Sequence, residues 1–483
     1  MKGDFTRLTF DPTKHYTRVL EQQGRVQVDS DFNEMAYIHQ YFLRRLAADL
    51  IGPHGGPGDG FKLEALKDNG NDVLQDFGVA SGHYYVDGIL CESEAPLRYT
   101  TQRSFPLSDA SKLGKDTSYV AYLDVWERHV TELEDEDENK IGIREVALRG
   151  PDTATRAQIV CQVKSKEVDN TTKGDLTSND PAKVAKAYET FLKFLGDTAL
   201  SPGLLRARAI KPKADDEPCL ISPQARYRGA ENQLYRVEIH RGGLAMPSDL
   251  SNVKIDINKI ATFKWSRENG SVIFPIASVQ GDVVTLKHLG REGRFGLRPD
   301  DWVEIVDDDY VLQNRAEPLL QVKDINVDTQ SVTLKTAPAS AVGTDQSKHP
   351  LLRRWDQPDS QAERGIAVVE GIGDEDSSWI TLEDGVQIQF AAPTPPPVIG
   401  PAPPRRGAAA TEPAPAFRTG DYWLIPARVA TGDVEWPGPP ANPLQRPPYG
   451  VEHSYAPLAV ISVAADGTVE VVKDLRRAIN RTL

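Results

Sequence analysis

The chain has 483 residues and a net charge of −14, with 39% hydrophobic and 26% charged residues. This composition is typical of a soluble globular protein of about two to four domains. The acidic balance argues against a general binder of nucleic acid or of an anionic membrane, because phosphate neutralisation needs a basic surface. The cysteines form no Cys-x-x-Cys pair, so they indicate neither a zinc ribbon nor a disulfide scaffold; they are Cys91, Cys161 and Cys219.

The segment after Met1 has no apolar signal sequence, and no run reaches the roughly 18 apolar residues that a membrane-spanning helix needs. We therefore expect no membrane insertion. We expect synthesis and residence in the cytoplasm; release by lysis, as part of a larger particle, would leave no trace in the sequence.

The opening segment, from Phe5 to about Leu50, carries the clearest pattern in the chain. Asp31 stands three residues before Glu34, which is the spacing of a helix capping box. Apolar residues then recur every three to four positions and predict an amphipathic helix that ends at Gly52. The predicted apolar stripe consists of Phe32, Met35, Ile38 or His39, Phe42, Leu46 and Leu50. The stripe needs a partner, which is either the body of the protein or another subunit.

The next part of the chain predicts short strands. Residues 51–60 are glycine-rich but lack the Gly-Lys-Ser/Thr of a phosphate-binding loop, so they predict a flexible connector. Residues 61–79 predict an irregular segment, and Asp87-Gly88 predicts a hairpin. Further strands are predicted at 118–128, 143–148 and 156–163, with a turn at Gly150-Pro151-Asp152.

A second helix is predicted over residues 179–195, with Asp180 as its cap and Pro181 at its first position. From about Gln224 onward, short strands alternate with closely spaced turns, a pattern that favours barrels or sandwiches. Residues 391–416 are rich in proline and alanine and predict a semi-rigid excursion. Strands resume at 420–428 and close the chain at 455–463 and 469–474.

The predicted fold class is mainly β, with sandwich-like or barrel-like antiparallel domains, an N-terminal α+β module and a helical insertion. We divide the chain into an N-terminal docking module with one long helix at 1–60, a first β domain at 61–175, a helical insertion at 176–215, a second β region at 216–390, a Pro/Ala-rich loop at 391–417 and C-terminal strands that complete the β region at 418–483.

Several acidic residues are candidates for chemistry. Glycoside hydrolysis needs two carboxylates, which could come from Asp124, Glu127 and the acidic run 132–138. The mechanism depends on the distance between the two carboxyl groups, and the sequence does not define that distance. Asp300-Asp301 and Asp307-Asp308-Asp309 offer oxygen ligands for calcium but lack the EF-hand spacing. Solvent-facing or salt-bridged side chains are the alternative interpretation of both groups.

The remaining motif searches identify no reactive site. The nine histidines form no metal-binding cluster, and no Gly-x-Ser-x-Gly elbow is present. We therefore assign no catalytic, cofactor-binding or metal-binding residue and expect that the protein is not an enzyme and uses no cofactor. Aromatic residues in strands can stack on sugars or fill a core; the tryptophans are Trp126, Trp265, Trp302, Trp355, Trp379, Trp423 and Trp436.

Distinctive stretches occur along most of the chain, among them Arg18-Val-Leu-Glu-Gln-Gln-Gly-Arg-Val-Gln-Val-Asp-Ser-Asp-Phe-Asn-Glu34, Leu123-Asp-Val-Trp-Glu-Arg128, Phe263-Lys-Trp-Ser-Arg-Glu-Asn-Gly-Ser271 and Gly420-Asp-Tyr-Trp-Leu-Ile-Pro-Ala-Arg428. They resemble a poorly characterised bacterial family encoded in phage-tail-like contractile injection system loci. The opening is also similar to the start of some phage baseplate and tail-fibre-attachment proteins. This resemblance implies a structural component of an extracellular injection particle, at its baseplate or tip, and carries over no catalytic residue.

We therefore expect a particle subunit that acts by assembly, with other particle subunits and copies of itself as partners, and with no nucleic acid. A carbohydrate-binding adhesin that uses the tryptophans and a glycoside hydrolase that uses Asp124 or Glu127 are the alternatives. Position in the particle, copy number, symmetry, a cargo role, glycan binding and a structural calcium stay open. Deletion of residues 1–52 is predicted to leave the β-region folded but to abolish incorporation into particles.

Overall fold

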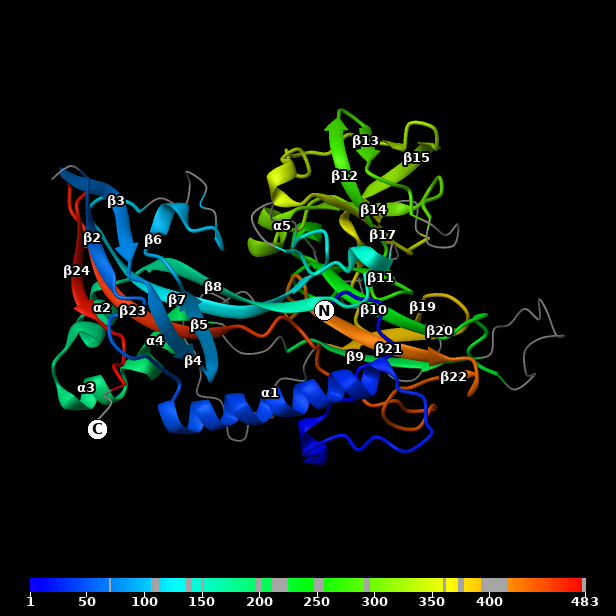
Figure 1. Cartoon of the computed structure of the whole chain (residues 1–483), viewed down its shortest axis with the longest axis horizontal. Helices are drawn as coiled ribbons and strands as arrows, with labels where there is room; N and C mark the ends of the chain where they lie inside the picture. Colours follow the sequence, from blue (N-terminus) through cyan, green and yellow to red (C-terminus); the bar gives the residue numbers. More distant parts are fainter. Residues whose placement is uncertain are drawn as a thin grey trace, which may run out of the picture.

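The structure is a computed structural model, and it describes residues 1–68, 71–105, 107, 113–135, 141–148, 152–196, 202–210, 225–246, 256–290, 296–358, 362–371, 378–391 and 416–479. The described chain is mainly β, as the sequence predicts, and its sheets are antiparallel. Two β-rich halves lie side by side, and the long helix α1 (Asp29–Ile51) runs along one edge of both (Figure 1). No described helix is both long enough and apolar enough to cross a membrane.

The first half is built on a sheet with the strand order β24-β23-β7-β8. Its strands are β7 (Thr117–Val130), β8 (Arg156–Glu167), β23 (Ser454–Val463) and β24 (Val469–Asp474). Two smaller sheets, β1-β4-β5 and β2-β3-β6, pack on it. Their strands are β1 (His54–Gly55), β2 (Leu63–Asp68), β3 (Asn71–Val79), β4 (Gly82–Val86), β5 (Ile89–Ser93) and β6 (Leu97–Arg98).

One apolar core lies between these sheets because alternate residues of each strand point to the same side. Leu123 and Val125 of β7 and Ile461 of β23 are fully buried in it. The closing strands 455–463 and 469–474 therefore belong to the first half, although β21 and β22 of the same C-terminal segment lie in the second half. The C-terminal strands thus divide between the two halves of the molecule.

The second half pairs a sheet of order β18-β11-β10-β21-β22 with a sheet of order β19-β20-β9. Its strands are β9 (Leu204–Ala209), β10 (Gln233–Arg241), β11 (Thr262–Ser266), β18 (Ile366–Ala367), β19 (Ile380–Thr381), β20 (Val386–Ala391), β21 (Tyr422–Arg428) and β22 (Asp433–Val434). Aromatic rings fill the core between the two sheets. Phe390 contacts Phe263 at 5.1 Å and Trp423 at 5.9 Å between ring centroids.

A closed six-stranded barrel, β12-β13-β16-β15-β14-β17, is inserted between β11 and β18 in the chain. Its strands are β12 (Ile273–Gln280), β13 (Val283–Leu286), β14 (Trp302–Val306), β15 (Leu320–Asn326), β16 (Ser331–Leu334) and β17 (Leu351–Trp355). Val284, Val322 and Leu334 are fully buried in its interior, as expected for a barrel small enough to be filled by side chains. The barrel stands on the five-stranded sheet in Figure 1.

The predicted second helix, at 179–195, is two short ones, α3 (Pro181–Ala185) and α4 (Ala187–Leu195). They are preceded by α2 (Asn170–Thr177), which was not predicted, and the remaining short helix is α5 (Asp308–Leu312). Asp180 caps α3 and Pro181 begins it, as predicted. The chain kinks at Lys186, and α4 then places Phe191 against β7 and β23. The insertion therefore covers the outer face of the four-stranded sheet of the first half.

Three predictions of local structure are wrong. Helix α1 begins at Asp29 with no side-chain cap, and Glu34 instead accepts a hydrogen bond from the Thr9 hydroxyl at 2.6 Å. Residues 61–79 form the hairpin β2–β3, because their alternate apolar residues reach the core. Residues 146–148 form a 3₁₀ turn with exposed apolar side chains, since no sheet covers them. Residues 150–151 of the predicted turn and residues 392–415 of the predicted excursion lie outside the described residues.

Candidate functional site

One side of helix α1 is held firmly against the body of the protein. Phe10 stacks on Tyr37 with ring centroids 5.8 Å apart. The Arg44 guanidinium lies 2.5 Å from the Glu127 carboxylate of β7, and the Gln40 amide donates to the same carboxylate at 3.0 Å. Ile38 is buried on this side. These contacts fix the rotation of α1 about its own axis, so the opposite side must face outward.

The turn between β4 and β5 fixes the helix further. Gly88 has a φ of 76°, and a side chain at this position would overlap the backbone carbonyl of Arg44. At the end of α1, the Arg477 guanidinium donates to the carbonyl of Ile51 at 2.6 Å. The helix is therefore attached at several points along its length rather than by its ends alone.

The outward side of α1 is apolar and exposed to solvent. Phe32 is 68% exposed, Leu43 68%, Leu46 58% and Leu50 77%. Residues 15–28, here called the N-terminal arm, lead into the helix and add further exposed apolar residues, namely Tyr16, Leu20, Val26 and Val28. Contiguous apolar surface on a monomer is the usual mark of a protein–protein contact. The partner that the sequence pattern requires is therefore not supplied by the described part of this chain.

A buried cluster of charges ties the start of the chain to the five-stranded sheet and to the barrel. The Lys264 ammonium of β11 lies 2.7 Å from Glu304 of β14 and 3.5 Å from Glu238 of β10. Glu238 also pairs with Arg236 at 2.5 Å and with Lys2 at 3.1 Å. Four of these five side chains are at most 5% exposed. Burying a charge is costly unless it is paired, so each of these groups stabilises the burial of the others.

The protonation of this cluster follows from its burial and its pairing. Burial alone would raise the pKa of Glu304, but the nearby Lys264 and His240 and the hydrogen bonds from Lys264 and Tyr310 lower it to about 2. Burial lowers the pKa of Lys2 to about 8, although Glu238 opposes the effect. The cluster is thus ionised at neutral pH and holds the first residues of the chain against the sheet.

Sequence reasoning missed this cluster. Residues 233–240 alternate between apolar and polar, which predicts a strand with one face in water. Instead, the polar face with Arg236, Glu238 and His240 is covered by the first residues of the chain and by the barrel. One local signal was available. Arg236 and Glu238 carry opposite charges two positions apart on the same strand, so they lie on one face and can pair with each other.

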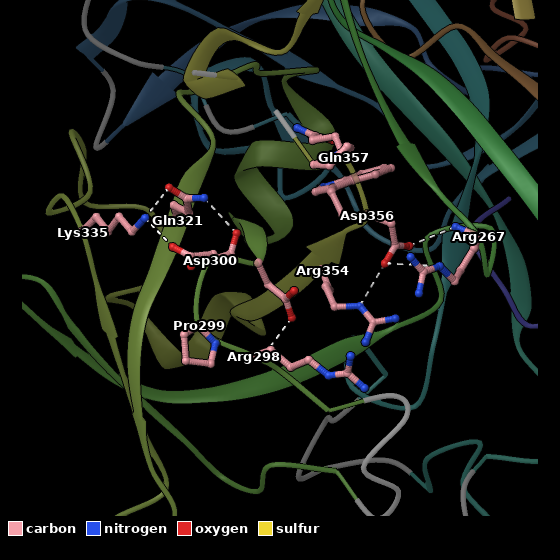
Figure 2. Close-up of a pocket in the computed structure, with 12 residues that line it drawn as sticks. Arg267, Arg298, Pro299, Asp300, Gln321, Lys335, Arg354, Asp356 and Gln357 are labelled. Atoms are coloured by element: carbon pink, nitrogen blue, oxygen red, sulfur yellow. Dashed lines mark hydrogen bonds and ion pairs between the residues drawn. The ribbon is translucent and has the colours of Figure 1, made fainter. Parts of the chain in front are cut away.

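A polar pocket of about 570 Å³ lies where the barrel meets the five-stranded sheet (Figure 2). It is lined by Arg267, Arg298, Pro299, Asp300, Asp301, Gln321, Lys335, Arg354, Trp355, Asp356, Gln357 and Pro358. Some of its charged groups pair with one another. Asp356 lies 3.3 Å from Arg354, and Asp300 lies 2.5 Å from Lys335. Two of the three carboxylates that line the pocket are therefore already paired with cations of the pocket itself.

Glu268, beside this pocket, has an unusual environment. It lies 3.3 Å from Arg354. Burial, together with the neighbouring Asp356, raises the pKa of Glu268 to about 7. A raised carboxyl pKa can mark an acid catalyst. Here the carboxyl group lies beside Arg354, which also pairs with Asp356, and Arg267 pairs with the same aspartate. These ion pairs give Glu268 a structural environment.

The predicted hydrolytic pair is not brought together. Asp124 is 3% exposed and pairs with Lys164 and His453, each at 2.6 Å. Glu127 pairs with Arg44 of α1. An odd separation of three residues places the two carboxylates on opposite faces of β7. Both are structural partners in this fold, and the part of the acidic run at 136–138 lies outside the described residues.

The candidate calcium ligands and the tryptophans also have structural partners. Asp307 caps α5, Asp308 pairs with Arg128 and His349, and Asp309 pairs with Lys348. Among the described residues, no three His, Cys, Asp or Glu side chains are grouped as a metal site. Six of the tryptophans are each at most 6% exposed: Trp126, Trp265, Trp302, Trp355, Trp379 and Trp423. These six therefore fill cores and present no flat surface on which a sugar could stack.

The architecture defines a multi-sheet β protein with an inserted barrel and one long helix along its edge. The model of DUF6519, described as a family of unknown function, matches residues 1–174 and 165–395. The chain therefore belongs to this family. Comparison with curated proteins and with solved structures found no match.

Proposed function

We propose that this protein is a structural subunit of a phage-tail-like contractile injection particle, at its baseplate or tip, and that it acts by docking rather than by catalysis. The outward side of α1 carries the proposal. It places Phe32, Leu43, Leu46 and Leu50 on the surface of a helix whose other side is already occupied. The resemblance of the sequence to contractile injection system proteins supplies the kind of assembly.

The attachment of α1 suits a docking role. Contacts from the first half and from the N-terminal segment hold the helix, so its outward side is ordered before a partner arrives. A preformed surface loses less conformational entropy on binding than a mobile one. An apolar helix face is also a common recognition element, because residues three and four positions apart form one continuous strip.

The test is incorporation of point variants into particles. A Leu43→Asp/Leu46→Asp chain is expected to fold, because both side chains are exposed, and to be absent from purified particles. Val146→Asp is the matched control, since it places the same charge on an apolar residue that is 75% exposed elsewhere. Incorporation of the double variant at the level of the control would contradict the proposal.

The structure changes the expected result of deleting residues 1–52. Asn269 donates to the Gly3 carbonyl at 2.8 Å, and Lys2 pairs with buried Glu238. The deletion would uncover these groups and would weaken the body as well as remove α1. The point variants separate docking from stability, which the deletion does not.

A further inference from the structure

We infer that the outward side of α1 packs against α1 of a second copy of this chain, in an antiparallel pair about a twofold axis. This inference rests on the proposed function, because it names the partner of the same surface. It is carried by three observations: the spacing of the exposed residues, the distribution of charge along the helix, and the single polar residue at the centre of the strip.

The exposed strip has the spacing of a coiled-coil seam. Its residues are Phe32, Ala36, His39, Leu43, Leu46 and Leu50, and all six are exposed. They are separated by four, three, four, three and four positions, which is the alternation of a and d sites in a heptad repeat. On the side that faces the body, the same spacing falls on polar residues such as Ser30, Glu34 and Arg44. The apolar repeat therefore belongs to the side that has no partner in the described chain.

The strip is complementary to itself when it is reversed. Pairing Phe32 with Leu50 of the second copy also brings Ala36 opposite Leu46 and His39 opposite Leu43. Each layer then joins an a site to a d site, which is the pairing that antiparallel helices require. A twofold axis repeats each layer, so the pair has six layers and both copies use the same surface.

The charges on α1 favour the antiparallel direction. The N-terminal part carries Asp29, Asp31 and Glu34. The C-terminal half carries Arg44 and Arg45 against the single acid Asp49, and Arg477 donates to the carbonyl of Ile51 at its end. An antiparallel arrangement places the acidic end of one helix near the basic end of the other and also opposes the two helix dipoles. A parallel arrangement would place ends of like charge together.

His39 defines the register of the pair. It is the one ionisable side chain of the strip, and it lies near the centre, where the twofold axis would pass. A single polar residue in an apolar seam specifies register at a cost in stability. In the antiparallel pair, both copies of His39 pack next to Leu43. Any shift by a heptad would move His39 onto a different neighbour and leave apolar residues unpaired at both ends.

The first measurement is the mass of the purified full-length chain by sedimentation. We expect twice the chain mass of 53.2 kDa at micromolar concentration. Leu43→Asp should weaken the dimer at least about 100-fold, because it places a charge in the central layers. Val146→Asp should leave the dissociation constant within about threefold. His39→Leu should tighten the dimer about tenfold, since it removes the polar residue from the seam.

Cross-linking tests the direction of the helices. Positions 32 and 50 are 18 residues apart, so about 27 Å separates them along the axis at 1.5 Å per residue. Phe32→Cys mixed with Leu50→Cys should form a disulfide-linked heterodimer under mild oxidation, whereas each single variant alone should not. Wild-type protein provides the background for its own cysteines. Efficient linkage within the Leu50→Cys variant alone would indicate a parallel pair and overturn the inference.

The outcomes separate this inference from the proposed function. A wild-type chain that stays monomeric, or a dimer that Leu43→Asp leaves intact, overturns the helix pairing. If the wild type is monomeric and Leu43→Asp/Leu46→Asp is still excluded from particles, α1 docks on a different subunit and the proposed function stands. If the wild type dimerises through α1 and the same double variant is incorporated normally, the pairing stands and the proposed function fails.

Discussion

Replacement of Lys264 by methionine is the sharpest test of the buried charge cluster. Methionine keeps most of the apolar stem of lysine but removes the ammonium that lies 2.7 Å from Glu304. Glu238 would keep Lys2 and Arg236 as partners. Glu304 would keep the hydrogen bonds from the Tyr310 hydroxyl and the Trp355 indole, with His240 at 3.9 Å. Burial lowers the pKa of His240 to about 4, so at pH 7 the variant leaves the buried carboxylate with no charged ion-pair partner among the described residues.

The expected magnitude follows from the pKa of Glu304. Its ordinary value is 4.5 and its value in the fold is about 2, so at about 1.4 kcal/mol per pH unit its ionised form stabilises the fold by about 3 kcal/mol. Because the pKa is lowered, this stability is fully present above pH 4.5 and is lost as the pH falls toward 2. Removing one partner of a buried pair costs about 3–5 kcal/mol by comparison with other proteins. We expect a loss of about 3 kcal/mol at pH 7.

Urea unfolding followed by tryptophan fluorescence is the assay, since Trp355 lies 4.4 Å from the Lys264 ammonium and reports on this site. Lys335→Met is the control. Lys335 forms an exposed pair with Asp300, so its loss should cost less than about 1 kcal/mol. Lys264→Met/Glu304→Gln should recover part of the stability, because the unpaired charge is gone. A loss below about 1 kcal/mol for Lys264→Met, or a double variant that loses the sum of both single changes, would refute the reasoning.

Two further changes test the attachment of α1 and the acid beside the pocket. Gly88→Ala should lower the free energy of unfolding by more than about 1 kcal/mol, because alanine is strained at a φ of 76° and its methyl group would overlap the Arg44 carbonyl. Hydrogen exchange should become faster in α1 and stay unchanged in the barrel. Glu268→Gln should raise the melting temperature at pH 8 and change it little at pH 5. The raised pKa of Glu268, about 7, means that its stabilising contribution is present at low pH and is lost as the pH rises through 7; an equal shift at both pH values would contradict this sign.

The sequence allowed the class of fold to be predicted, but not how the strands combine. Alternation and turn residues identified most strands because these signals are local. The partners of those strands are not local, and nothing near residues 454–463 indicates that they pair with β7. The same limit explains the polar face of β10: Arg236 and Glu238 look solvent-facing until the start of the chain and the barrel are placed over them.

The candidate site, the outward side of α1, was easier to predict than the strand pairing. Most of the exposed apolar stripe of the first helix was predicted from sequence, including Phe32, Leu46 and Leu50, whereas Ile38, also offered for the stripe, is buried on the body side. The predicted cap, Asp31, lies three residues after the actual N-cap, Val28. Periodicity alone left open whether the stripe faced the body or another subunit. The answer depends on Arg44 and Gln40, whose contacts with Glu127 turn the opposite side of the helix inward. These contacts join residues more than 80 positions apart, so no local signal could reveal them.

The position of β23 has a consequence for synthesis of the chain. Strand β7 lies between β8 and β23, yet Asp124 and its partner His453 are 329 residues apart. As the ribosome makes the protein from its N-terminal end, one edge of β7 stays without its neighbour until almost the whole chain has emerged. Such an edge can pair with other chains in the meantime. The four-stranded sheet of the first half can therefore be completed only after almost the whole chain has been made, and an incomplete chain cannot present α1 on a finished body.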